Sequence, residues 1–363
     1  MGEFADCYRR AESRESGGLY VRGLLADKVA RKNCWQLAEV VGLERPKPLE
    51  RLLNEGDWEA DEVCQRLRGL IKEQFSFVPG VGVIDESGFV KKGEESAGVA
   101  RQYCGRLGKV ENCQVGVFLG YVSPKGHAFL DRRLYLPKGW CEDRERLLGA
   151  KIPEAAHEFK TKPQLALELL ERSWSEGIPM QWVVADTTYG NSPGLRQAIA
   201  KQGHYYVMEL GARHQLLYEG KRLSLKSLAA TISAEDWLLL SRLGEQGPLT
   251  ELWASRRVIM PNDDLGEQWL LIRRSLADAD ELSCYLCNAP ADTSLSDMVS
   301  VAWARHDIEQ LLKEGKHQLG MADYEVRSWH GWHRHMTLVM LAHSFLAFKR
   351  AQQREKKALA DVA

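Results

Sequence analysis

The spacing of apolar residues along the chain changes near residues 80 and 290, and this separates helical from strand-rich segments. Residues 1 to about 75 follow the 3.6-residue period of amphipathic helices. A helical run over 19–43 ends at a glycine-bearing stop, and the proline-containing segment 44–53 turns into a further helix. The first part of the chain is therefore expected to be a helical domain.

The segment 35–43 and the helix after it loosely match the first half of a helix-turn-helix. Arg31, Lys32 and Arg45 lie near this pair and could contact phosphates. A helical bundle that only packs on the next domain explains the same pattern, so both interpretations stay open here.

From residue 80 the apolar runs become short or alternating, which is typical of strands separated by turns. The first three runs predict consecutive strands of an antiparallel meander. The fourth is almost wholly apolar, which predicts a central strand. The expected strands cover residues 81–93, 112–123, 127–137, 180–190 and 204–210, and the expected helices between them cover 162–177 and 192–203. This order of three strands, helix, strand, helix, strand fits a ribonuclease-H-like fold.

The remaining pattern completes an α+β architecture. Polar turns and short strand-like runs predict a β-rich insert, and two helices are expected after Pro290, over 299–320 and 335–360. The expected fold class is thus a ribonuclease-H-like domain, a mixed five-stranded sheet flanked by helices, with a β-rich insert and a helical N-terminal domain. The expected bounds are 1–78 for the N-terminal domain, 79–210 for the first part of the ribonuclease-H-like domain, 211–285 for the insert, 286–350 for the C-terminal helices of the ribonuclease-H-like domain and 351–363 for a charged tail.

The composition of the chain indicates where the protein is located and says little about its activity. No run approaches the ~18 consecutive apolar residues of a membrane span, and the N-terminus lacks the apolar centre of a signal peptide. A cytoplasmic protein without membrane contact is expected. The 49 basic and 50 acidic residues exclude an overall polycationic binder but permit a local basic stripe. Cys284 and Cys287 lie in a strand-like run and are expected to be buried thiols, with a metal or redox role as the alternative.

Two aspartates come directly after apolar runs of the expected sheet. Asp85 follows 81–84 and Asp186 follows 182–185. The first and fourth strands of a ribonuclease-H-like sheet are neighbours, so the two carboxylates should lie side by side. Cleavage of a phosphodiester by two Mg²⁺ ions needs carboxylates that converge from different elements. A solvated strand end is the alternative for either aspartate alone.

A third carboxylate lies on the helix expected after the insert. Arg305, Glu309 and Lys316 share one narrow face of that helix, while Trp303 and Leu311 lie on the other side. One carboxylate between two cations suits a metal ligand beside a phosphate backbone. A surface ladder of ion pairs explains the same face. Glu86, Asp131 and Asp143 are further carboxylates near strand ends, and Glu86 should point away from the face of Asp85.

Several short motifs stand around these carboxylates. They are Ile84–Phe89 with Lys91–Gly93, Gly98–Gly105, Asn112–Gln114, Leu134–Pro137, Ala185–Gly190, Arg305–Glu309, Leu319–Gly320, Tyr324–Arg327 and Trp329–Trp332. Together they resemble the DDE transposases of bacterial insertion sequences, in the branch with a β-rich insert before the last carboxylate. The likeness runs from about residue 20 to 350. Ala302 stands where the family has a tyrosine, with Trp303 next to it.

The resemblance implies a site and an activity. Asp85, Asp186 and Glu309 would bind two Mg²⁺ ions, with Mn²⁺ as a substitute, while Arg305 and Lys316 would hold DNA phosphates. The enzyme would cut at the ends of an insertion sequence and join the exposed 3′-hydroxyl to target DNA. The expected partners are double-stranded DNA, as terminal inverted repeats and target, and a second copy of the chain on paired ends. The alternatives are a transposase-derived DNA-binding protein without turnover and a ribonuclease-H-like nuclease with another task.

Other side chains are candidates for DNA contact. The basic stretch 91–109 could line a DNA channel or form a plain solvated loop, and the dense aromatic and cationic cluster 329–335 is expected to combine packing with DNA contact. His333 and His335 in that cluster suggest zinc, but no further ligand completes a set. The expected DNA-binding residues are Lys91, Lys92, Arg101, Tyr103, Tyr189, Arg305, Lys316, Arg327, Trp329 and Arg334, with Arg106 and Lys109 in the same basic stretch.

Overall fold

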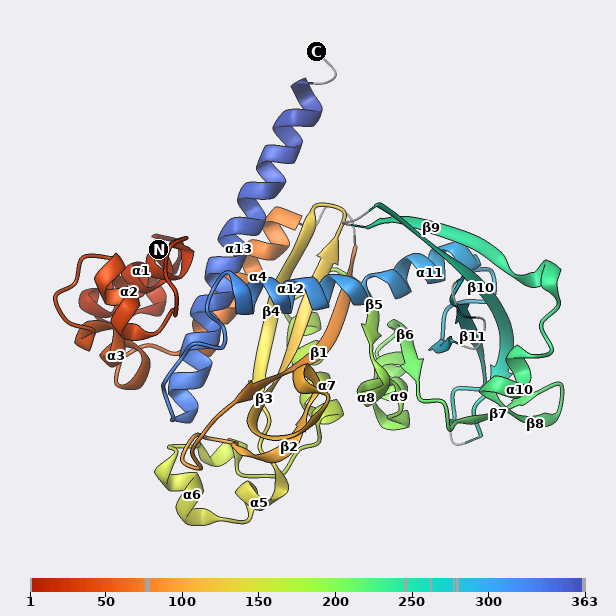
Figure 1. The fold of residues 1–363 in the computed structure, drawn as a ribbon, viewed down its shortest axis with the longest axis horizontal. Coiled ribbons are helices and arrows are strands. Elements are labelled where there is room, and N and C mark those ends of the chain that lie inside the picture. Colours follow the sequence, from red (N-terminus) through yellow and green to blue (C-terminus); the bar gives the residue numbers. More distant parts are fainter. Residues whose placement is uncertain are drawn as a thin grey trace. The chain divides into compact units, whose positions relative to one another are not determined.

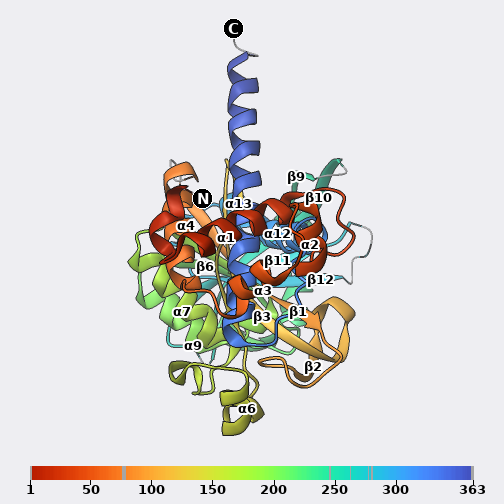
Figure 2. The ribbon, with the colours of Figure 1, turned by 90° about the vertical axis from the view of Figure 1, so that its left-hand side faces the viewer.

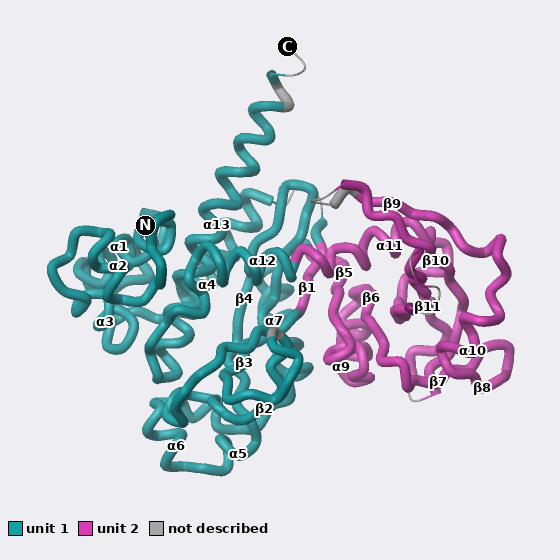
Figure 3. The backbone as a smooth tube through the Cα atoms, viewed as in Figure 1, with its two compact units in different colours: residues 1–80, 85–179, 308–363 teal, residues 81–84, 180–307 magenta. Residues whose placement is uncertain are grey.

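The computed structural model describes residues 2–75, 79–244, 247–261, 263–276, 278 and 281–360. It divides the chain into two compact units (Figure 3). Unit 1 comprises Met1–Gly80, Asp85–Pro179 and Ile308–Ala363, and unit 2 comprises Val81–Ile84 and Met180–Asp307. One strand, β1 (Gly80–Val90), contributes residues to both units.

Unit 1 begins with short helices. They are η1 (Gly2–Cys7), α1 (Ala11–Leu25), α2 (Cys34–Val40), α3 (Lys47–Asn54) and α4 (Ala60–Phe75). The single helical run expected over 19–43 is wrong, because a loop separates α1 from α2. Asn33 starts α2 by accepting a hydrogen bond from the backbone N–H of Gln36 at 3.1 Å. Figure 2 shows α1 crossing α13 (Trp329–Ala360), the long C-terminal helix of this unit, which α3 also contacts.

The sheet of unit 1 contains the strands of the expected meander. Strand β3 (Lys109–Ser123) neighbours β1 and pairs antiparallel with both β4 (Gly126–Leu134) and β2 (Ala100–Cys104). The edge strand β2 was not expected, because its exposed and half-buried residues leave little apolar signal. Helices α4, α7 (Lys162–Ser175) and α13 pack against β4 (Figure 1). The remaining elements of this part are η2 (Gly105–Leu107), α5 (Lys138–Cys141), α6 (Arg144–Gly149) and η3 (Glu154–Ala156).

Unit 2 contains the apolar centre of the predicted catalytic sheet. Strand β5 (Met180–Ala185) lies between β1 and β6 (Tyr205–Leu210), and it runs parallel to β6. Val183 and Val184 are fully buried, as expected for a central strand. A Cβ on Gly82 would lie 2.1 Å from the sulfur of Met180, so glycine permits the close approach of β1 to this segment. After β5 come α8 (Thr187–Gly190) and α9 (Pro193–Lys201).

The β-rich insert is present and continues the sheet of unit 2. Strand β12 pairs antiparallel with β6, and the order then runs β12, β11, β10, β7, β8, with β9 on β10. The elements are β7 (Gln215–Tyr218), β8 (Lys221–Ser224), α10 (Leu225–Ala229), η4 (Ala234–Asp236), β9 (Leu238–Gly244), β10 (Gly247–Ile259), β11 (Glu267–Arg274) and β12 (Leu282–Cys287). Cys284 and Cys287 of β12 are buried free thiols, and burial raises the pKa of each to about 12.

The helix expected over 299–320 is in fact two helices. α11 (Leu295–Trp303) and α12 (Arg305–His317) are separated by a turn at Ala304. Trp303 is held in unit 2, where its indole N–H donates to Glu251 at 2.9 Å. Ile308 and Leu311 are fully buried in unit 1. The break therefore allows apolar residues before Ala304 to pack in the core of unit 2 and those after it to pack in the core of unit 1.

The predicted fold class is confirmed. The structure has mixed strands flanked by helices, a β-rich insert and helices at the start of the chain, which fits a ribonuclease-H-like domain. Within the described part of the chain, no helix combines the length and apolar character needed to cross a bilayer.

Candidate active site

Asp85 lies where β1 passes from one unit to the other. The preceding Val83 and Ile84 are fully buried, whereas Asp85 is half-buried and its Oδ1 accepts a hydrogen bond from the N–H of Glu86 at 2.8 Å. The carboxylate of Glu86 accepts from Lys162 on α7 at 2.5 Å. Glu86 is thus paired with a cation of α7.

Asp186 comes directly after β5 and caps α8. Its Oδ1 accepts from the N–H of Thr188 at 2.9 Å, and its Oδ2 accepts from the hydroxyl of the same threonine at 3.4 Å. The strand expected over 180–190 therefore ends at Ala185, and the last residues form the short helix. A Cβ on Gly190 would lie 1.9 Å from the carbonyl oxygen of Glu209, so α8 sits directly against β6. These contacts fix the orientation of the Asp186 carboxylate.

Glu309 lies on the solvent side of α12. It is exposed, and Arg305 and Lys316 are half-buried, while Leu311 on the other side is fully buried. This distribution agrees with the face expected from the helical period. Trp303 lies on α11 and does not belong to this helix.

The three carboxylates come from both units. Asp85 and Glu309 belong to unit 1 and Asp186 belongs to unit 2. Asp85 directly follows Ile84, a residue of unit 2, and Glu309 is the second residue after Asp307, the last residue of that unit. Each is a hard oxygen donor of the type that Mg²⁺ and Mn²⁺ prefer, so the donor set fits these ions.

Other carboxylates near strand ends have structural partners. Asp131 is fully buried and accepts from Arg68 of α4 at 3.0 Å and from the N–H of Arg132 at 2.8 Å. Asp143 caps α6 by accepting from the N–H of Arg146 at 3.1 Å. These contacts account for both residues without a metal.

The expected DNA-binding residues differ in their exposure. Some are exposed or half-buried and some are enclosed in the fold. Lys92, Arg101, Tyr103 and Arg327 are exposed, Lys91, Arg305 and Lys316 are half-buried, and Tyr189, Trp329 and Arg334 are buried. The side chain of Arg106 lies outside the described residues.

The cationic groups of Arg334 and Lys32 both donate hydrogen bonds to backbone carbonyls. The guanidinium of Arg334 donates to the carbonyl of Gly56 at 2.6 Å and to that of Trp58 at 2.9 Å. The ammonium group of Lys32, expected as a phosphate contact, is buried and donates to three carbonyls, including that of Gln318 at 2.6 Å. In this fold both cations act as cross-links between helices and loops.

A basic groove of about 480 Å³ collects several expected contacts in unit 1. We use this name for the hollow whose charged lining residues are Arg31, Lys91, Lys92, Arg327, Glu95 and Glu325. The ammonium group of Lys91 lies 3.5 Å from the ring centre of Tyr324 and donates to the carbonyl of that residue at 3.2 Å. Burial lowers the pKa of Lys91 to about 8. The nearby Arg31 lowers this pKa further, whereas Glu325 partly raises it.

Sequence reasoning missed one cluster of ionisable side chains. His127, Glu314 and His343 place a nitrogen or oxygen atom of each within 4.8 Å of one another. Their positions are too far apart in the chain for any spacing rule to connect them, so only the packed fold reveals the group.

Comparison with known proteins identifies the family to which the chain belongs. Residues 3–227 match the family model of the DDE superfamily endonucleases, and the chain belongs to this family. It is also 25% identical over 320 residues to the probable transposase for insertion sequence element IS701 of Microchaete diplosiphon, a match that covers 84% of this chain and 74% of that protein. The family match includes Asp85 and Asp186 and ends before Glu309.

Proposed function

We propose that this protein is a DNA transposase that cuts at the ends of an insertion sequence and joins the 3′-hydroxyl to target DNA. The observation that carries the proposal is the placement of Asp85 on β1 and of Asp186 directly after the neighbouring strand β5, inside the segment that matches the DDE endonucleases. The resemblance to the IS701 transposase supports transposition over other nuclease tasks.

In this proposal Asp85, Asp186 and Glu309 converge to hold two Mg²⁺ ions. Covalent continuity favours the convergence, because Asp85 follows Ile84 of β1 directly and β1 neighbours β5. When bound, the ions would activate the attacking oxygen and stabilise the leaving one. Asp186 enters such a site preoriented, because its bonds to Thr188 limit the rotation of its carboxylate.

DNA contacts are proposed from the cations that remain accessible. They are the lysines and arginines of the basic groove, Arg305 and Lys316 on α12, and Arg101 on the edge strand β2. Arg101 and Tyr103 of β2 are both exposed, and residues two apart in a strand face the same side. A cation beside an aromatic ring suits a phosphate next to an unstacked base. Tyr189, Trp329 and Arg334 are left out because they are buried.

The assembly and domain organisation are proposed as well. Two copies would act on a pair of terminal inverted repeats, and the domain bounds are those inferred from the pattern of the chain. Helices α2 and α3 would form the part that recognises the DNA ends. The proposed DNA-reading role of these helices is separate from the chemistry of the three carboxylates.

A strand-transfer assay tests the function. The purified chain is mixed with Mg²⁺, a labelled duplex that carries an element end and a supercoiled target plasmid. A transposase gives nicked ends with free 3′-hydroxyl groups and labelled plasmid. Binding without cleavage would identify a DNA-binding protein without turnover, and cleavage without joining would identify a nuclease with another task. Either result would contradict the proposal.

A further inference from the structure

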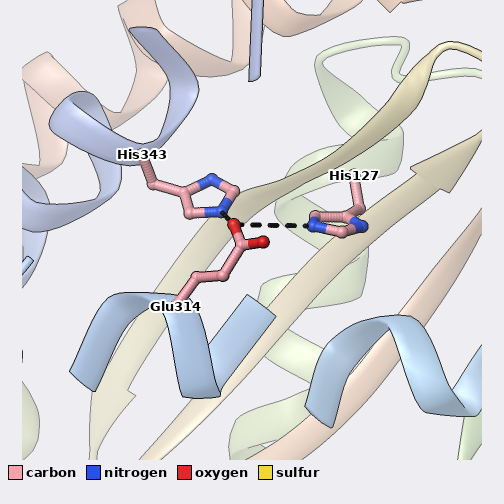
Figure 4. A group of neighbouring side chains, drawn as sticks. All are labelled: His127, Glu314 and His343. Atoms are coloured by element: carbon pink, nitrogen blue, oxygen red, sulfur yellow. Dashed lines mark hydrogen bonds and ion pairs between the residues drawn. The ribbon is translucent and has the colours of Figure 1, made fainter. Parts of the chain in front are cut away.

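Three side chains from three elements of unit 1 point toward one another (Figure 4). His127 comes from β4, Glu314 from α12 and His343 from α13. The Oε2 atom of Glu314 lies 3.0 Å from Nε2 of His343 and 3.9 Å from Nε2 of His127. The two imidazole rings are stacked, with centres 5.8 Å apart.

The group is largely removed from solvent. The side chain of His343 is fully buried, that of Glu314 is 8% exposed and that of His127 is 19% exposed. Burial of a carboxylate is costly unless positive charge compensates it. Arg350 supplies one such charge, 2.9 Å from Oε2 of Glu314. The nitrogen lone pair of a neutral imidazole is what a metal ion binds.

We propose that His127, Glu314 and His343 form a binding site for a zinc-class transition metal ion. Two imidazole nitrogens and one carboxylate oxygen, with a fourth position open to water, are a common zinc ligand set. Ligand atoms about 2.1 Å from a tetrahedral ion lie about 3.4 Å apart. The separations of 3.0 and 3.9 Å between Glu314 and the two imidazoles bracket that value, and all three ligand atoms lie within 4.8 Å of one another.

The surroundings of Glu314 resemble the outer shell of a metal site. Arg350 donates to its Oε2 at 2.9 Å and Gln310 donates to its Oε1 at 3.2 Å. Carboxylate ligands are usually held by hydrogen bonds of this kind, which fix their orientation. A carboxylate oxygen has lone pairs for both a donor and an ion. Two imidazole ligands also favour Zn²⁺ over Mg²⁺.

The ion would have a structural task that is separate from the proposed DNA chemistry. Glu314 and Glu309 lie on the same helix, α12, and the zinc ligands connect that helix to β4 and α13. The site would thus fix the helix that carries Glu309 to the core of unit 1. This inference does not require the protein to be a transposase.

The test uses the full-length chain with Zn²⁺ and Co²⁺ as probes. With the chelator-stripped protein in excess Mg²⁺, one Zn²⁺ per chain should bind and raise the melting temperature. Co²⁺ should give the strong visible absorption of a four-coordinate site. His127→Ala should weaken Zn²⁺ binding by at least about 100-fold, since it removes a direct ligand.

Two controls keep the result decisive. Asp186→Asn removes a carboxylate of the proposed Mg²⁺ site and should leave Zn²⁺ affinity unchanged. His127 is more exposed than the fully buried His343, which makes its variant safer for folding, and circular dichroism checks this. Absence of saturable Zn²⁺ binding would show that the cluster is an ion pair only. Unchanged affinity in His127→Ala would place the ion elsewhere, and either outcome overturns the proposal.

Discussion

Among individual residues, burial determines whether a cationic side chain bonds to the protein backbone or stays exposed to solvent. Lys32 and Arg334 are enclosed and donate to backbone carbonyls, whereas Lys92 and Arg327 are exposed on the rim of the basic groove. The sequence places all four in basic or aromatic surroundings and does not separate them. The distinction depends on contacts with distant segments, such as that between Lys32 and Gln318.

The replacement Lys32→Met should destabilise the protein without a direct effect on DNA affinity. It leaves three carbonyls without their ammonium donor, one of them in a buried contact, and an unsatisfied buried group typically costs about 1–3 kcal/mol. Urea unfolding followed by tryptophan fluorescence measures the loss. Lys28→Met is the matched control, because Lys28 is exposed in the same loop region and should change stability little. Equal stability of the two variants would rule out the proposed cross-link.

The basic groove should bind DNA in a pH-dependent manner through Lys91. Its pKa of about 8 lies below the usual 10.5, so its charge is present below about pH 8 and is lost as the pH rises through that value. The slope of the logarithm of the DNA-binding constant against the logarithm of the salt concentration should therefore decrease by the equivalent of about one phosphate contact between about pH 7 and 9. Lys91→Arg should abolish this change, because arginine stays charged. Lys92→Arg should retain it. Persistence of the full change in Lys91→Arg would contradict the assignment.

At the level of helices and strands, periodicity predicted the core elements and missed the breaks. Strands β3, β4, β5 and β6 follow from apolar runs that become buried, and the insert follows from short runs separated by polar turns. The turn at Ala304 could not be predicted, because the apolar period continues through it and only the packing of its two sides in different units separates α11 from α12. Strand β2 lacked a signal because it lies at an edge.

Gly190→Ala should displace α8 and the aspartate that begins it. The added Cβ would meet the backbone oxygen of Glu209 at 1.9 Å, and overpacking of this kind typically costs about 1–3 kcal/mol. Because Asp186 caps this helix, Mg²⁺-dependent cleavage should fall more than stability alone explains. Gly194→Ala on α9 is the control, since no atom lies within 4 Å of its added Cβ. Crystal structures and cleavage rates of both variants check the effect, and a normal rate in Gly190→Ala would refute it.

In the molecule as a whole, each compact unit is built from segments that are not contiguous in the chain. Asp85, Asp186 and Glu309 could be proposed from the sequence because two follow apolar runs, one lies on a helical face with two cations, and the motifs around them resemble those of the DDE transposases. The group of His127, Glu314 and His343 could not, since its members are separated by many elements. Local patterns thus predict residues at the ends of elements, whereas clusters of distant residues need the fold.

The central claim is that three carboxylates act together in Mg²⁺-dependent cleavage. Its most direct test compares the cleavage rate of a labelled element end by the parent with the rates of Asp85→Asn, Asp186→Asn and Glu309→Gln. Asp143→Asn is the control, because asparagine can keep the cap of α6. Each of the three variants should bind the DNA and lose at least about 100-fold in rate, the size expected when a preorganised electrostatic group is removed. Parent-like cleavage by any of the three would contradict the account.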